Sequence, residues 1–398
     1  MKAIDSTKTR GRPRLGEVTL LSVALAAAWP STGVAASAEE LEQRVDQLER
    51  ELDSVRKEAR AEERAATRWH LAGYASAGYA DSDIDNDSFN AGTFNPGFHF
   101  QYRDLVLFES EFEFSTTADG ETETELEYSQ LNVFLHDSVT LVVGKFLSPI
   151  GQFQERLHPA WINKLPTRPA GFGHGGAQPL NEIGVQLRGG VPVGNQKVTY
   201  AVYTGNGPRI GHHGVELEGF GSDDNDDKAF GGRFAWFPLP QLELGVSFLE
   251  ADELEPEDAG SGPAPTTPGY SLQGVDAAYT QGSWDVRFEY LDSELDGFTG
   301  AAEEGASSNE AIAKTEWEAF YVQVAYQFGK WEPVLRYGEF EIDGFDEFAE
   351  DAEDRTSIGI NYLFGPSFMG KAAFEDRDFA DPAAEDDERF VLQLAYGF

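Results

Sequence analysis

RFVLQLAYGF (389–398) places an apolar residue at every second position. These apolar residues are Phe390, Leu392, Leu394, Tyr396 and Phe398. Successive side chains of a β-strand point to opposite faces, so one face of this segment is apolar and the other is polar or small. A strand that separates lipid from a water-filled interior needs this pattern. The segment therefore predicts a membrane β-strand.

The same alternation recurs along the chain from Trp69 onward. Two clear examples are residues 284–290 and 316–328. A soluble β-sandwich also alternates, so a single strand does not identify a membrane protein. We predict sixteen strands, near 69–80, 94–102, 104–115, 126–136, 138–147, 181–190, 196–205, 228–237, 241–250, 271–280, 283–292, 316–328, 331–342, 355–364, 367–377 and 388–398.

The connections between these segments alternate in kind and decide the fold class. Short ones contain Gly or Pro and are typical of tight turns, as at Gln281-Gly282 and Gly365-Pro366. Long ones are polar and acidic, as at 222–228 and 251–260. Short turns at one end and long loops at the other are typical of bacterial outer-membrane barrels. We therefore expect an all-β, transmembrane, antiparallel up-and-down barrel of about sixteen strands.

Composition agrees with this expectation and excludes some partners. The chain has 398 residues, a net charge of −40, 13% aromatic residues and no Cys. Such acidity argues against a nucleic-acid partner. The mean hydropathy of −0.41 suits a barrel, because only alternate residues of each strand face lipid. We expect no cofactor.

The amino-terminal part divides into two segments before the barrel. Residues 1–36 resemble a secretory signal peptide: four basic residues precede an apolar stretch at 20–29, and small residues precede Ser37. The alternative is an uncleaved anchor. Residues 37–67 contain no Gly, Pro or aromatic residue, and apolar residues recur there at spacings of three and four. This predicts a short periplasmic coiled-coil helix, or else an amphipathic helix on the barrel or membrane surface. The barrel would span 68–398.

Three stretches resemble a known family of porins. They are GKFLSPIGQFQERLHPAWINKLPTRPAGF (144–172), TYAVYTGNGP (199–208) and LQLAYGF (392–398). They are similar to phosphate-selective porins of the O and P type, and dicarboxylate-type coiled-coil porins share the layout. The resemblance implies a trimeric sixteen-stranded pore, and an assembly-machinery signal at Leu394, Tyr396 and Phe398. Dense Arg and Lys ladders are typical of the phosphate channels. This chain has only 30 Lys plus Arg, so phosphate specificity does not carry over.

Strand alternation also indicates which charges face the interior. One Arg or Lys from each of several strands falls on the polar face, and one strand adds a row of three Glu. Fixed charges of this kind set ion selectivity in pores. The alternative is that these Arg and Glu side chains only form ion pairs with one another across the strands. The predicted pore-lining charges are Lys145, Arg188, Arg233, Arg287, Arg336, Lys371, Glu109, Glu111 and Glu113.

The long connection at 149–180 is the best candidate for a constriction. Loops of this length in compact proteins are usually functional or disordered. It carries Glu155, Arg156, Lys164 and Arg168, and its aromatic residues could anchor it inside the barrel. The alternative is a loop folded over the external rim.

Other chemistry is weakly indicated. The acidic loops could bind divalent cations beside lipopolysaccharide, but a plain solvated loop explains them equally well. The adjacent pair His212-His213 is a weak metal motif, and we expect no metal site. No nucleophile stands in an elbow motif, so we expect no enzyme. The sequence predicts an outer-membrane porin for passive diffusion of small hydrophilic solutes, anions among them. The alternatives are a structural envelope barrel and a barrel enzyme.

Overall fold

The computed structural model describes residues 44–53, 67–84, 86–211, 214–223, 225–301, 306–344, 352–381 and 384–398. Sixteen long strands form one antiparallel sheet. They are β1 (Thr67–Ser82), β3 (Thr93–Tyr102), β4 (Val106–Thr116), β5 (Thr122–His136), β6 (Val139–Leu147), β7 (Asn181–Val193), β8 (Gln196–Gly205), β11 (Ala229–Leu239), β12 (Leu242–Ala251), β13 (Tyr270–Gln281), β14 (Trp284–Leu295), β17 (Thr315–Tyr326), β18 (Trp331–Asp343), β19 (Glu353–Gly365), β20 (Phe368–Phe379) and β21 (Asp387–Gly397).

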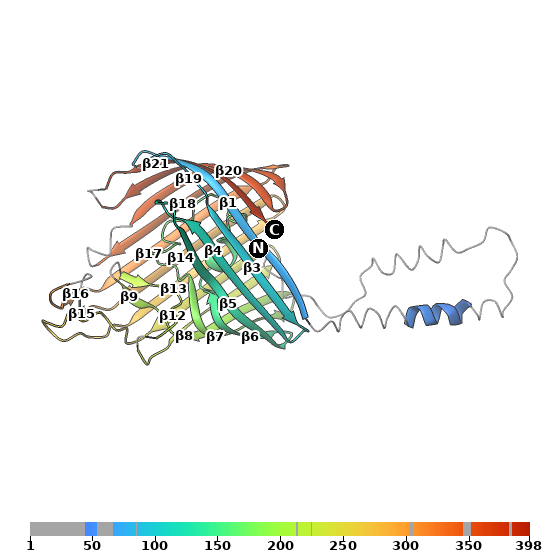
Figure 1. Ribbon diagram of the computed structural model, residues 1–398, viewed down its shortest axis with the longest axis horizontal. Helices are drawn as coiled ribbons and strands as arrows, with labels where there is room; N and C mark the ends of the chain where they lie inside the picture. Colours follow the sequence, from blue (N-terminus) through green and yellow to red (C-terminus); the bar gives the residue numbers. More distant parts are fainter. Residues whose placement is uncertain are drawn as a thin grey trace. The chain divides into compact units, whose positions relative to one another are not determined.

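The sheet closes on itself because its first and last strands pair. In Figure 1 the blue β1 runs beside the red β21. Their register runs from Tyr74 opposite Gly397 to Ser82 opposite Arg389. Gly73 and Phe398 exchange two backbone hydrogen bonds, at 3.0 and 2.9 Å, at the end of this seam. A closed barrel leaves no strand edge unpaired, which lipid surroundings require. The predicted sixteen-stranded antiparallel barrel is confirmed.

Short turns and long loops lie at opposite ends of the strands. At one end the connections are as short as 194–195 and 282–283, and Gly194 and Gly282 both adopt φ of +61° there. A positive φ strains any residue with a Cβ, so glycine suits these turns. At the other end, connections reach the length of 148–180 and 206–228.

Short strands inside the long connections were not predicted. β2 (Ser88–Asn90) pairs with β1, β9 (Arg209–Gly211) with β10 (Gly214–Glu216), and β15 (Phe298–Gly300) with β16 (Glu310–Ile312). Each has three residues, too few for a period of two to stand out.

The barrel wall has two chemically different faces. Apolar side chains such as Leu335, Ile358 and Phe374 point outward and are 51%, 58% and 44% exposed. Their neighbours in sequence point inward and are mainly polar, as Arg336 and Ser357 are. Among the described residues, no helix has the length and apolar character that a membrane-spanning helix needs.

The amino-terminal segment forms a unit separate from the barrel. The barrel unit runs from Arg68 to Phe398, and the chain before it is described only as a helix over residues 44–53. Val45 and Leu48 of this helix are exposed. The proposed signal peptide at 1–36 and most of the segment 37–67 lie outside the described residues, so the coiled coil stays a prediction.

Candidate functional site

Residues 148–180, which we call the inner loop, lie against inward-facing side chains of the barrel wall. The loop contains the π-helix η1 (Phe153–Leu157). Phe153 and Phe172 pack edge-on against Tyr321 of β17, with ring centroids 6.3 and 5.0 Å away. Ile150 is fully buried beside them in the same apolar cluster. The loop therefore has a small hydrophobic core of its own against the wall.

A buried carboxylate of β14 holds the first turn of the inner loop. Glu289 is completely buried and accepts hydrogen bonds from the backbone N–H of Gln152 at 3.0 Å and of Phe153 at 3.2 Å. Tyr321 and Gln178 donate to the same carboxylate at 3.2 and 3.3 Å. Four donors therefore converge on one carboxyl group. Glu289 therefore fixes both ends of the loop to one strand.

Two buried cations hold the second half of the inner loop. The Arg336 guanidinium of β18 donates to the Thr167 carbonyl at 3.1 Å, the Thr167 hydroxyl at 3.0 Å and the Arg168 carbonyl at 3.1 Å. The Lys371 ammonium of β20 donates to the carbonyls of Ala160 and Leu165. These bonds reach mostly backbone atoms, so they depend on the wall residues more than on the loop sequence.

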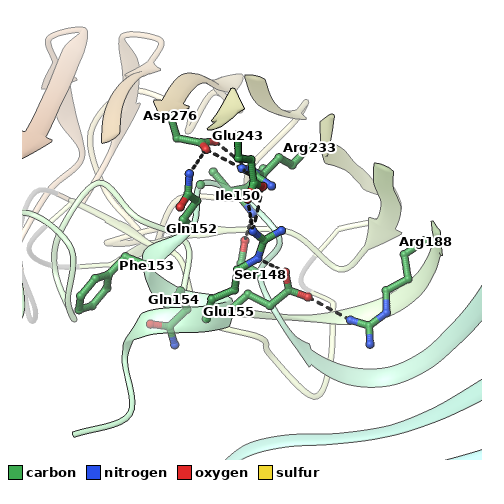
Figure 2. A network of polar contacts seen from close by, with 12 residues as sticks. Ser148, Ile150, Gln152, Phe153, Gln154, Glu155, Arg188, Arg233, Glu243 and Asp276 are labelled. Atoms are coloured by element: carbon green, nitrogen blue, oxygen red, sulfur yellow. Dashed lines mark hydrogen bonds and ion pairs between the residues drawn. The ribbon is translucent and has the colours of Figure 1, made fainter. Parts of the chain in front are cut away.

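A third group of wall charges surrounds the start of the loop (Figure 2). Arg233 of β11 bonds to Asp276 of β13 and to Glu243 of β12. Gln152 of the loop donates to Asp276. Its side-chain oxygen accepts from Arg287 of β14 at 2.9 Å, and Arg287 also pairs with its neighbour in the strand, Asp285. The charges here neutralise one another and bind the loop at the same time.

One edge of the inner loop remains open to solvent. Glu155 bridges Arg188 of β7 at 3.0 Å and its own neighbour Arg156 at 3.8 Å, and Figure 2 shows Glu155 and Arg188 joined across the gap from loop to wall. The side chains of Glu155, Arg188 and Arg156 are 27%, 36% and 31% exposed, respectively. At a different part of the loop, Lys164 pairs with Glu332 of β18 at 2.7 Å and is 27% exposed. The acidic partners behind them, Glu243 and Glu332, are below 10%. At these two parts of the loop, near β7 and near β18, solvent therefore meets more cationic than anionic side chains.

The three predicted glutamates form an inward row on β4. Glu109 accepts from Asn132 at 2.9 Å, Glu111 from Tyr128 at 3.4 Å and Glu113 from Asn95 at 2.9 Å. The loop reaches this row through His158, whose Nε2 is 3.9 Å from Glu111 Oε1. Glu109 and Glu111 are buried, at 7% and 1% exposure.

Two expectations about the predicted charges need correction. Lys145 lies on the outward face, because it is paired with Ser129 and Ile183 and shares the parity of the exposed Val143. Second, three cations expected to line the pore are covered by the inner loop or held in ion pairs. Arg233, Arg336 and Lys371 point inward but are only 5%, 2% and 3% exposed, too little to meet a solute.

Of the remaining predicted residues, Arg287 pairs locally and contacts the loop, whereas Arg168 donates to Gln154 at 3.2 Å within it. Sequence reasoning missed Glu289 and Asp276 as loop-binding residues. Both lie on the inward face of their strands, but nothing in the local sequence distinguishes them from other inward acids.

Residues 171–179 of the inner loop are tied to a neighbouring loop by His174 and Glu218, which lie 2.6 Å apart. The hydrogen bond to Glu218 raises the pKa of His174 above its usual 6.5, and the bond to His174 lowers the pKa of Glu218 below 4.5. Because the pKa of His174 is raised, its interaction with Glu218 stabilises the fold fully below pH 6.5, and this stabilisation is lost as the pH rises through the raised pKa. Because the pKa of Glu218 is lowered, the same interaction stabilises the fold above pH 4.5, and this stabilisation is lost as the pH falls through the lowered pKa.

We expect the tie to be strongest between these limits. In NMR titrations of the folded protein, His174 should titrate above pH 6.5, and Glu218→Gln should bring its midpoint down. An unchanged midpoint in Glu218→Gln would contradict the pairing.

Fold and site together define a closed sixteen-stranded antiparallel β-barrel whose inner loop is hydrogen-bonded to residues of the wall. No protein-family model matches the sequence, and no curated protein does. Solved structures do match. A loop L8 deletion mutant of OmpT, an outer membrane protein of Vibrio cholerae, shares 14% identity over 84% of this chain and 100% of its own, with a TM-score of 0.55. The in-vitro folded trimer form of OmpT shares 13% identity over 84% of this chain and 100% of its own, with a TM-score of 0.51. At this identity the likeness establishes the fold.

Proposed function

We propose that this protein is an outer-membrane porin through which small hydrophilic solutes diffuse. The observation that carries the proposal is the inner loop, bound across the interior of a sixteen-stranded barrel with one charged edge open to solvent. Barrels of this size enclose an aqueous lumen unless something fills it. The inner loop narrows that lumen and would act as the constriction.

The proposal includes a preference for anions. Arg156, Arg188 and Lys164 are each more than a quarter exposed, and Glu155 is the one acid of this group with similar exposure. The other two acids that pair with these cations, Glu243 and Glu332, are less than 10% exposed. Charged rings at a constriction set selectivity, whereas loop carboxylates beyond the Debye length of about 8 Å act mainly on the vestibule. Resemblance to phosphate-selective porins supports the architecture, and we do not extend it to phosphate.

The proposed setting is the bacterial outer membrane, with lipid and lipopolysaccharide around the barrel and the amino-terminal helix in the periplasm. Leu394, Tyr396 and Phe398 are 52%, 48% and 42% exposed on the outward face, where an assembly machine could read them. We further propose a homotrimer, which the trimer form of the similar OmpT supports.

Liposome swelling tests this function. Proteoliposomes should swell in isotonic solutions of small sugars, and the rate should fall steeply with solute size and show no saturation. Folded protein that produces no swelling would exclude a porin and favour a structural barrel or a barrel enzyme.

Neutralising the open edge should reduce the anion preference. We expect Arg156→Gln and Arg188→Gln each to move the reversal potential in a KCl gradient toward zero, and the double variant to move it furthest. Arg389→Gln is the control, because Arg389 pairs with Asp387 of its own strand β21 and not with a residue of the inner loop. A shift in the control as large as in Arg188→Gln would contradict this assignment.

A further inference from the structure

The outward face of the barrel carries two different arcs. The strand register shows which acids share the outward face with the exposed apolar residues. Asp81, for example, is paired with the exposed Phe390 across the β1–β21 seam. We call β12–β14, β17–β21 and β1 the acidic arc, because the outward positions near the long loops carry carboxylates on every one of these strands except β13. These are Glu250, Asp292, Glu294, Glu316, Glu318, Glu339, Glu341, Asp343, Asp354, Asp376, Asp378, Glu388 and Asp81.

Many of these carboxylates stand directly opposite one another. Asp292 is paired with Glu318, and Glu318 with Glu341, so one row crosses three strands. A second row joins Glu339 to Asp354 and Asp378. Like charges directly opposite destabilise a sheet, and burying them without partners costs far more. The acidic arc is therefore unsuited to pressing against a second copy that presents the same rows.

The remaining strands, β3–β8 and β11, form an acid-free arc. Among their described outward positions there is no Asp or Glu; the side chains are mostly apolar, aromatic or hydroxyl-bearing, and Lys145 and the amides Asn181 and Gln196 are among the exceptions. Phenylalanines pair across β3 and β4 with ring centroids 6.1–6.3 Å apart: Phe94 with Phe114, Phe98 with Phe112 and Phe100 with Phe108. Protein interfaces are enriched in aromatic residues and depleted in Asp and Glu at their centres.

We infer that the acid-free arc is the face through which copies of this chain associate in the membrane. Lipid around a monomer would contact both arcs alike and would give no reason for their difference. Association through β3–β8 and β11 buries the arc without charge repulsion, and leaves the carboxylate rows in contact with water and headgroups. This inference rests on the proposed membrane setting and names the self-contact surface.

Site-specific photo-crosslinking tests the inference on the intact protein in its membrane. Phe100 of β3 and Phe374 of β20 are both outward-facing phenylalanines, each 44% exposed, on the acid-free and the acidic arc respectively. A photoreactive phenylalanine analogue at 100 should yield covalent oligomers of this chain, and the same analogue at 374 should not. Equal oligomer yields from both positions, or none from position 100, would overturn the inference.

A pair of matched charge variants gives a second, independent readout. Thr124 of β5 is outward and opposite Phe114, and Thr356 of β19 is outward and opposite Asp376. Thr124→Glu should reduce the oligomer fraction at least tenfold in detergent, measured by sedimentation, while Thr356→Glu leaves it unchanged despite its greater local repulsion. Heat-shifted gel migration confirms that both barrels fold. Oligomers that survive Thr124→Glu would contradict the assignment. If the dissociated Thr124→Glu variant keeps its porin activity, the pore of each barrel does not depend on the interface.

Discussion

Arg336→Met should increase the single-channel conductance several-fold and broaden its fluctuations. The guanidinium makes three hydrogen bonds to Thr167 and Arg168 from a side chain that is 2% exposed. Each such bond to a charged group contributes roughly 1.5–3 kcal/mol. Methionine fills a similar volume but makes none of them. The second half of the inner loop should then leave the wall and open the lumen.

Lys371→Met should act in the same direction, and the double variant should exceed either single one. Arg336→Lys should restore part of the wild-type conductance, since an ammonium can still donate to the loop carbonyls. A merely structural role would lower thermal stability without changing the channel. Wild-type conductance in a folded Arg336→Met barrel would therefore contradict the proposal that Arg336 holds the inner loop against the wall.

Gly73→Val should prevent closure of the barrel. A Cβ at Gly73 would lie 2.2 Å from the Asn95 carbonyl oxygen and 3.0 Å from the Phe398 ring. The first of these contacts is with backbone, which cannot swing away, so the penalty should exceed the roughly 1–3 kcal/mol of ordinary overpacking. The same glycine exchanges both backbone hydrogen bonds with Phe398. Strand β1 should thus lose its register with β21.

The measurement is the fraction of protein that migrates as a compact, heat-modifiable, protease-resistant form after refolding. Gly221→Val is the control, because nothing lies within 4 Å of a Cβ there. It should refold like the wild type. Normal refolding of Gly73→Val would show that the seam tolerates a side chain and that our account of closure is wrong.

The strands were predictable because their signal is local. Each of the sixteen lies within a few residues of the predicted range, since alternation records which side chains face lipid. Parity fails at β6, where VTLVVGKFL (139–147) is apolar on both faces. Val142 and Phe146 point inward and pack with the inner loop, so the sequence alone could not place Lys145.

The binding of the inner loop was less accessible to sequence. Its length marked it as important, but the decisive pairs are far apart in the chain: Gln152 with Glu289, and Thr167 with Arg336. Parity shows which face a charge occupies and not whether another segment covers it. Arg336 and Arg188 therefore look alike in sequence, although one is buried and the other is 36% exposed.

Single-channel recording of the purified wild-type protein in a planar bilayer under a KCl gradient tests the central claim most directly. The account predicts stepwise, ohmic conductance with a reversal potential on the anion-selective side. Cation selectivity would keep the pore but contradict the role given to Arg156 and Arg188. No conductance from correctly folded protein would contradict the porin itself.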